Sequence, residues 1–198
     1  TLVKDEDGLP DGIRKKYIGV AMKKAERLED LINEFFEVAR YNFTQMALEY
    51  STVNLTVMIE QLLYEFKPVF DKKGLSYNTD IGQDIIVQCD IEKIERVFDN
   101  LFRNVVNYSY ENTDIKVSLK DNGKGIKFIV ENCGKTIPKE KITCIFDRFF
   151  RIDNSRSTET GGAGLGLAIV KEITSLHNWT VNCESEDEKI RFIINIKK

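Results

Sequence analysis

Residues 146–169 read FDRFFRIDNSRSTETGGAGLGLAI: an aromatic and basic cluster, a polar loop, and glycines leading into an apolar helix. Gly162, Gly164 and Gly166 stand two apart, and without side chains they let bare backbone approach an anion. The helix expected after them points its first N–H groups, with their partial positive charge, at the same place. The stretch therefore predicts a phosphate site beneath a polar flap.

Two common phosphate motifs do not fit these glycines. The dinucleotide fingerprint G-x-G-x-x-G needs a longer last gap and a preceding strand. The phosphate loop G-x-x-x-x-G-K-[ST] also fails, because the only Gly-Lys-Thr, at 134–136, has Ile129 in place of the first glycine. The glycines alone leave open an ordinary loop before a core helix.

A second polar pattern lies upstream, in residues 90–109, DIEKIERVFDNLFRNVVNYS. Apolar side chains recur there at helical spacing, at Ile94, Val97, Phe98, Leu101, Phe102 and Val105. Asn100, Asn104 and Asn107 share another face at i, i+4 and i+7. Asparagine is a poor helix former, and a solvated face more often carries Lys, Glu or Arg. The stripe therefore favours a ligand surface.

Four runs resemble, in order, the N, G1, F and G2 boxes of the ATP-binding domain of sensor histidine kinases. They are NLFRN with NYS, ENCGKTIP, IFDRFFR and GAGLGL, at 100–109, 131–138, 145–151 and 162–167. Within the family, the vancomycin-resistance sensor kinases are similar in RYN, NYSYEN, TIPKEK and STETGGAGLGLAI, at 40–42, 107–112, 136–141 and 157–169. The resemblance extends over nearly the whole chain.

The hydrophobic pattern predicts two units. Residues 11–46 read as one long helix whose apolar seam suits a bundle. Beyond it we expect helices at 55–70, 90–109, 138–149 and 164–177 and strands at 75–79, 85–89, 114–120, 125–131, 179–184 and 190–196. Helices on one face of a mixed sheet make an α+β fold, a two-layer α/β sandwich, and the resemblance implies the same. It also implies that 1–50 is the second helix of a dimerisation hairpin and 51–198 the catalytic ATP-binding domain.

The adenine pocket has two candidate runs. DNGKGI at 121–126 matches the family's D-x-G-x-G-I, but it lies between two alternating strand patterns, and Asn-Gly there predicts a hairpin turn. NCGKTI at 132–137 follows the second strand and precedes the aromatic cluster, as the family's order requires. We therefore assign Asn132, Gly134 and Ile137 to the pocket.

Two positions depart from the family. Where it usually has aspartate to accept the adenine amino protons, Asn132 offers a neutral carbonyl oxygen and an amide donor that could reach ring N1. Losing the charge could cost on the order of 1 kcal/mol of affinity. Asn107 stands where the family commonly has Lys or Arg. The vancomycin-resistance group also shows Asn at the first position, so the resemblance implies a variant site.

The resemblance implies roles for the other site residues. Asn104 would bind, through its carbonyl oxygen, the Mg²⁺ that bridges the phosphates. Asn100 would contact phosphate or a metal-bound water, and Arg151 would reach the terminal phosphates. Tyr108 would pack on the adenine ring. Further nucleotide contacts are expected from Asn107, Gly162, Gly164, Leu165, Gly166 and Leu167.

Asn100 separates phosphotransfer from hydrolysis. Gyrase-like and chaperone ATPases of the same fold have a water-activating Glu there, whereas an amide cannot act as a base. The site would then present the γ-phosphoryl group to another nucleophile, which in the family is a histidine on the first bundle helix. The single histidine here, His177, ends the helix after the glycines, where we expect packing or capping.

From this resemblance we expect a protein-histidine kinase domain that uses ATP and Mg²⁺. The chain would be a fragment of the cytoplasmic portion of a bacterial membrane sensor, without its phosphoacceptor histidine and unable to autophosphorylate. Its partners would be the dimerisation helices of the homodimer and a response regulator. A non-enzymatic nucleotide-binding or dimerisation module stays open because Asn132 and Asn107 are neutral. A water-using ATPase is disfavoured by Asn100.

Composition sets the remaining bounds. The 198 residues, 42% hydrophobic, can hold one sizeable core plus an appendage. A net charge of -3 gives no basic field, which argues against nucleic acid as a partner, and no apolar run approaches a membrane span. The four cysteines form no C-x-x-C pair, which predicts free thiols.

Overall fold

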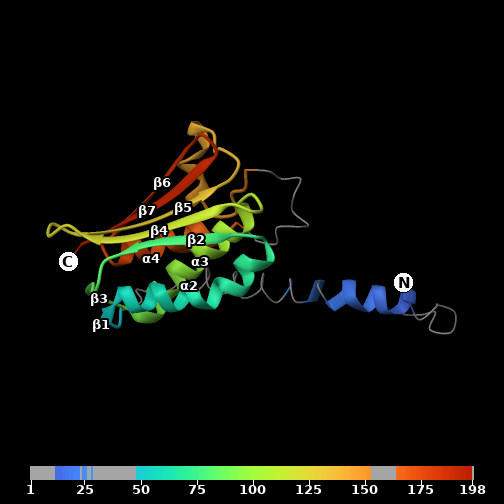
Figure 1. Cartoon of the computed structure of the whole chain (residues 1–198), viewed down its shortest axis with the longest axis horizontal. Helices are drawn as coiled ribbons and strands as arrows, with labels where there is room; N and C mark the ends of the chain where they lie inside the picture. Colours follow the sequence, from blue (N-terminus) through green and yellow to red (C-terminus); the bar gives the residue numbers. More distant parts are fainter. Residues whose placement is uncertain (1–11, 23, 26–27, 29–47, 153–163, 198) are drawn as a thin grey trace. The chain divides into compact units, whose positions relative to one another are not determined.

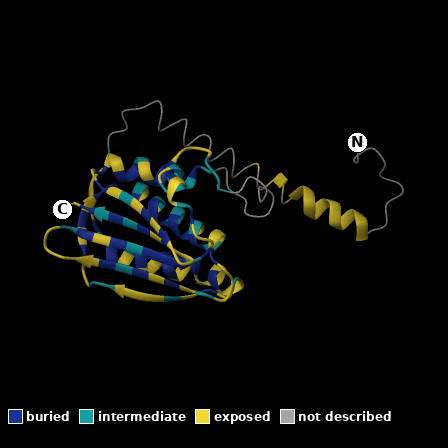
Figure 2. Cartoon of the chain, turned by 90° about the horizontal axis from the view of Figure 1, so that it is seen from above, coloured by how far each residue is buried: buried dark blue, intermediate teal, exposed yellow. Residues whose placement is uncertain are grey.

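A computed structural model describes residues 12–22, 24–25, 28, 48–152 and 164–197. The chain divides into two compact units, Thr1–Thr44 and Gln45–Lys198. In the first unit the described residues are helical and exposed (Figures 1 and 2). The rest of the helix predicted at 11–46 lies outside the described residues.

Three helices form one layer of the second unit: α2 (Leu55–Lys72), α3 (Ile91–Tyr108) and α4 (Gly166–Leu176) (Figure 1). Polar side chains begin the first two. Asn54 Oδ1 accepts the N–H of Val57, and Asp90 Oδ1 accepts the N–H of Lys93. The start of α4 has no side-chain cap. All three helices lie close to their predicted positions.

The second layer is a five-stranded sheet in the order β2-β4-β5-β7-β6. Its strands are β2 (Ser76–Ile81), β4 (Asp114–Asp121), β5 (Ile126–Cys133), β6 (Thr180–Glu186) and β7 (Lys189–Ile196). The β2 and β4 strands are parallel, and the other neighbours are antiparallel. The helices cover one face of this mixed sheet (Figure 1), which confirms the predicted two-layer α/β sandwich.

The core lies between the two layers. Along β4 buried and exposed residues alternate, so that one side of the strand faces the helices (Figure 2). Phe98 of α3 meets Phe128 of β5 with ring centroids 4.8 Å apart, and Phe66 of α2 meets Phe102 of α3 at 5.6 Å. These rings join α2, α3 and the sheet in one core.

Two features differ from the prediction. A second, two-stranded sheet pairs β1 (Ser51–Asn54) with β3 (Ile86–Cys89), and β1 had not been predicted. The helix predicted at 138–149 is wrong: the segment forms two 3₁₀ turns, Lys139–Lys141 and Cys144–Phe146. Each closes i→i+3 bonds and stops after one turn, and buried Ile145 and Phe146 anchor the second.

The turn between β4 and β5 confirms the predicted hairpin. Asn122 donates its N–H to the carbonyl of Gly125 at 3.1 Å, and Asp121 Oδ1 accepts the N–H of Gly123 at 2.9 Å. Gly123 has φ +79°, which favours glycine. Asp121 therefore ends β4 beside the turn, at the opposite end of β5 from Asn132.

Candidate functional site

The asparagine stripe of α3 contacts the start of α4. A Cβ added to Gly166 would stand 3.0 Å from Asn100 Oδ1, so glycine allows the close approach. Asn100 Nδ2 donates to the carbonyl of Arg96 at 3.0 Å, which holds the side chain on its own helix. Leu165 is buried and Leu167 half-buried. The fold thus brings together two patterns that are far apart in the sequence.

The aromatic cluster that precedes the predicted flap is hydrogen-bonded to the glycine segment that follows it. Phe149 donates its N–H to the carbonyl of Gly164 at 3.0 Å. Gly164 has φ +79°, and a Cβ there would come within 2.9 Å of the carbonyl oxygen of Phe150. Arg151 follows, half-buried. Gly162 and residues 153–163 lie outside the described residues.

Asn132, the last residue but one of β5, has a buried amide. Only 2% of the residue is exposed, and Nδ2 has no hydrogen-bond partner in the described part of the chain. A buried donor without a partner costs about 1–3 kcal/mol. A Cβ added to Gly134 would lie 3.4 Å from this Nδ2 and 2.4 Å from the carbonyl oxygen of Tyr108. Asn132 and Gly134, two of the predicted pocket residues, therefore lie close to the C-terminal end of α3.

The other predicted residues of α3 differ in exposure. Asn104 is half-buried, whereas Asn107 and Tyr108 are exposed, Tyr108 by 45%. Lys73 Nζ donates to the carbonyl of Val106 at 2.6 Å and to that of Asn107 at 3.4 Å. Burial lowers the pKa of Lys73, and Glu111 acts in the opposite direction. An ammonium group thus lies at the C-terminal end of α3, beside Asn107.

The turn between β6 and β7 holds the segment that follows Asn132. The carbonyl of Glu188 accepts the N–H of Gly134 at 2.8 Å, and the N–H of Glu188 is donated to Thr136 Oγ1 at 2.9 Å. Ser185 Oγ accepts the N–H of buried Ile137 at 2.9 Å. Ser185 and Glu188 belong to no motif, so the sequence did not predict them, and only the pairing of the strands brings them to the segment after Asn132.

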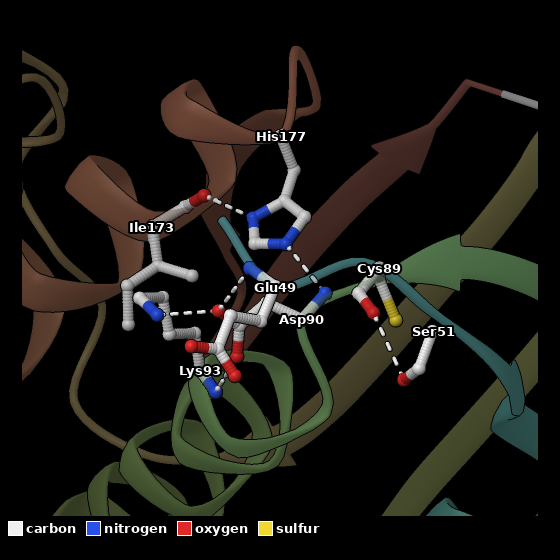
Figure 3. A network of polar contacts seen from close by, with 7 residues as sticks. All are labelled: Glu49, Ser51, Cys89, Asp90, Lys93, Ile173 and His177. Atoms are coloured by element: carbon white, nitrogen blue, oxygen red, sulfur yellow. Dashed lines mark hydrogen bonds and ion pairs between the residues drawn. The ribbon is translucent and has the colours of Figure 1, made fainter. Parts of the chain in front are cut away.

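His177 joins the start of α3 to the end of α4 (Figure 3). Its Nδ1 bonds the carbonyl of Ile173 at 2.9 Å, and its Nε2 accepts the N–H of Asp90 at 3.1 Å. Nδ1 therefore carries the proton of a neutral ring. Burial lowers the pKa of His177, while the bond to Ile173 and the charge of Asp90 act in the opposite direction. This confirms that His177 has a capping and packing role.

The described residues contain no group of three or more His, Cys, Asp or Glu side chains that could hold a metal ion. Among the described helices, none is both long and apolar enough to cross a membrane.

Residues 89–198 match the family of histidine kinase-, DNA gyrase B-, and HSP90-like ATPases, and the chain belongs to it as the catalytic domain of a sensor histidine kinase. Over its whole length it is 42% identical to the sensor protein VanSC of Enterococcus gallinarum, and over 99% it is 37% identical to the sensor protein VanS of Enterococcus faecium. It spans about half of these relatives, 55% and 51% of their lengths.

A solved structure agrees. The histidine kinase ThkA, in complex with the response regulator protein TrrA, matches with a TM-score of 0.79 and 26% identity, over 98% of this chain and 54% of that one. Together with the family match, this confirms the kinase family and the fold that the sequence predicted.

Proposed function

We propose that this domain binds ATP with Mg²⁺ and transfers the γ-phosphoryl group to a histidine, as the catalytic part of a sensor kinase. The observation that carries the proposal is the buried Nδ2 of Asn132 beside Gly134, which has no hydrogen-bond partner among the described residues. A purine ring with a hydrogen-bonding edge would supply the missing partner. Tyr108, exposed at the end of α3, is available to pack on that ring.

The start of α4 supports the phosphate end of this proposal. The first N–H groups of a helix have no intrahelical partner, and Leu165, the N-cap residue of α4, has no side-chain group that could accept from them. Gly166 lets a phosphate approach this end, where the helix dipole favours an anion. Asn104 would hold Mg²⁺ by its carbonyl oxygen, and the ion would neutralise phosphate charge. Arg151 is the candidate for the terminal phosphate.

The nearby side chains favour transfer to a protein nucleophile. Asn100, beside Gly166, has an amide that cannot take a proton from water. His177 cannot serve as the acceptor, because it is buried and both ring nitrogens are engaged. The acceptor histidine would then come from outside these 198 residues, and the chain alone would not phosphorylate itself.

Residues 1–50 would be the second helix of a dimerisation hairpin, and a response regulator would receive the phosphoryl group. The helix at 12–22 supports the first part, because it exposes Ile13, Tyr17, Ile18, Val20 and Met22, which suit contact with other helices. The complex of ThkA with TrrA supports the second part by similarity.

Titration with Mg²⁺ and a non-hydrolysable ATP analogue tests the proposal. We expect saturable binding that is lost in Asn104→Asp, where a carboxylate faces the phosphates, and weakened in Asn132→Ala. Asn182→Ala, an exposed amide on β6, is the matched control and should bind like the wild type. The absence of binding at millimolar nucleotide would contradict the proposal and leave a dimerisation module.

A second experiment separates transfer from hydrolysis. A helical hairpin that carries an acceptor histidine is added with ATP, and phosphohistidine is measured. We expect phosphohistidine only when both the hairpin and this chain are present. Steady phosphate release without the hairpin would instead indicate a water-using ATPase.

A further inference from the structure

The amide of Asn132 can both donate and accept a hydrogen bond, whereas a carboxylate at this position could only accept. An ionised Asp is an acceptor only, whereas an Asn amide has an NH₂ donor and a carbonyl acceptor side by side. Within the part of the chain that the structure describes, the atom of this amide without a partner is the donor, Nδ2, in a residue that is 2% exposed. A ligand edge with an acceptor satisfies this atom, whereas a ligand edge with only donors does not.

Purines divide into two classes by the positions of the donor and the acceptor on the edge formed by position 6 and N1. Adenine presents an amino donor at position 6 and an acceptor at N1, whereas hypoxanthine and guanine present a carbonyl acceptor at position 6 and an N–H donor at N1. A carboxylate that faces a 6-carbonyl sets two acceptors against each other. An amide satisfies either class, because a half turn about its last bond exchanges donor and acceptor.

The carboxylates of the described residues nearest to Asn132 are engaged elsewhere or lie at a distance, and the one of Glu188 accepts a hydrogen bond from the hydroxyl of Tyr110 at 3.1 Å. Glu131, the preceding residue, projects from the opposite face of β5, because side chains alternate along a strand. There it is paired with Lys116 and Arg191. Asp121 lies in the hairpin at the other end of the strand. Ile190, opposite Asn132 in the register, adds an apolar side chain.

We propose that the base pocket accepts 6-oxopurine nucleoside triphosphates as well as ATP, with Asn132 as the residue that permits both. The proposal rests on the proposed nucleotide function and goes beyond it by naming a second substrate class. With ATP, the carbonyl oxygen of Asn132 accepts from the amino group and Nδ2 donates to N1. With a 6-oxopurine, Nδ2 donates to the 6-carbonyl and the carbonyl oxygen accepts from N1–H.

Inosine triphosphate is the probe, because it carries the 6-oxo group without the 2-amino group of guanine. Calorimetric titration of the 198-residue chain with Mg²⁺ measures the dissociation constants of inosine triphosphate and ATP. In the wild type we expect them to agree within about tenfold. In Asn132→Asp the dissociation constant of inosine triphosphate divided by that of ATP should rise by at least about tenfold. The carboxylate accepts from the amino group of adenine but repels the 6-carbonyl of hypoxanthine.

Two further variants complete the test: a matched control at an exposed position, and a replacement in case the first variant does not fold. Asn182→Asp makes the same change on exposed β6 and should leave the ratio as in the wild type. If Asn132→Asp does not fold, Asn132→Ala replaces it: removing donor and acceptor together should weaken both nucleotides by a similar factor. Weakening of ATP alone would contradict the proposal.

Two failures can be told apart. If the wild type binds ATP and the ratio is unchanged in Asn132→Asp, the inference on base class is overturned while the proposed function stands. If the wild type binds neither nucleotide, the proposed function itself fails.

Discussion

The backbone N–H of Asp90 donates a hydrogen bond of 3.1 Å to Nε2 of His177, and this bond joins the first turn of α3 to the end of α4 (Figure 3). Asp90 Oδ2 also accepts the N–H of Glu49 at 3.2 Å and pairs with Lys93. The same two helices meet again where Asn100 contacts Gly166. The proposed phosphate end of the site therefore lies on two helices that contact each other at two points.

The first prediction concerns the protonation of His177. Burial lowers its pKa, so the unfolded chain takes up a proton near pH 6.5 while the folded chain resists it. The contribution of neutral His177 to the free energy of unfolding should therefore be complete above about pH 6.5 and be lost as the pH falls below it. Denaturant unfolding at pH 7.5 and 5.5 measures this loss. In His177→Gln the loss of unfolding free energy between pH 7.5 and 5.5 should be smaller than in the wild type. A loss as large as in the wild type would show that another group is responsible.

The second prediction concerns a charge ladder on the sheet face turned away from the helices. In register across β4, β5, β7 and β6, the side chains of Lys116, Glu131, Arg191 and Glu184 alternate in sign. Burial alone would raise the pKa of Glu131, but hydrogen bonds and charges from Arg191 and Lys116 outweigh it and lower the pKa. The ladder should therefore stabilise above about pH 4.3, and this contribution is lost as the pH falls through the lowered pKa.

Urea unfolding of Glu131→Gln tests the ladder. We expect a loss of about 1 kcal/mol at pH 7, because the partners are partly exposed, and a loss that shrinks as the pH is lowered through the depressed pKa of Glu131. Glu184→Gln is the control at the rim, since its carboxylate lies 4.0 Å from Arg191 and is largely exposed. A loss in Glu184→Gln as large as in Glu131→Gln would contradict the central position of Glu131.

The third prediction concerns Gly134. A methyl group there would stand 2.4 Å from the carbonyl oxygen of Tyr108, so Gly134→Ala must push apart β5 and the end of α3. We expect a loss of about 1–3 kcal/mol in unfolding free energy and weaker nucleotide binding. Gly123→Ala is the control, because an added Cβ there is strained by the positive φ but meets no atom within 4 Å. Both variants should lose stability, but only Gly134→Ala should lose affinity.

The fourth prediction concerns Ser185. Removing its hydroxyl in Ser185→Ala leaves the buried N–H of Ile137 without a partner, at a cost of about 1–3 kcal/mol. Amide hydrogen exchange at Ile137 should become faster, and the affinity for ATP should fall because the segment after Asn132 is less well held. Ser175→Ala, an exposed serine on α4, should change neither. Unchanged exchange at Ile137 would show that the hydroxyl is not its partner.

Much of the architecture was predictable because its signals are local. The helical spacing around Asn100 placed α3, and alternating strands on both sides of Asn122-Gly123 placed the β4–β5 hairpin. The 3₁₀ turns and β1 were not predictable in this way. β1 has only four residues and is defined by its pairing with β3, and the turns are set by the burial of Ile145 and Phe146.

By itself the sequence determined, through the resemblance of its motif runs, the kinase family and the grouping of asparagines and glycines into one candidate site. Side-chain spacing determined the order of most elements, since it fixes which residues of a helix or strand share a face. Only the tertiary structure decided that Asn132 keeps a buried donor without a partner in the described part of the chain. It also decided that Ser185 and Glu188 hold the segment after it, and that His177 binds Asp90. These contacts join residues far apart in the chain, and packing of the two layers brings them within hydrogen-bonding distance.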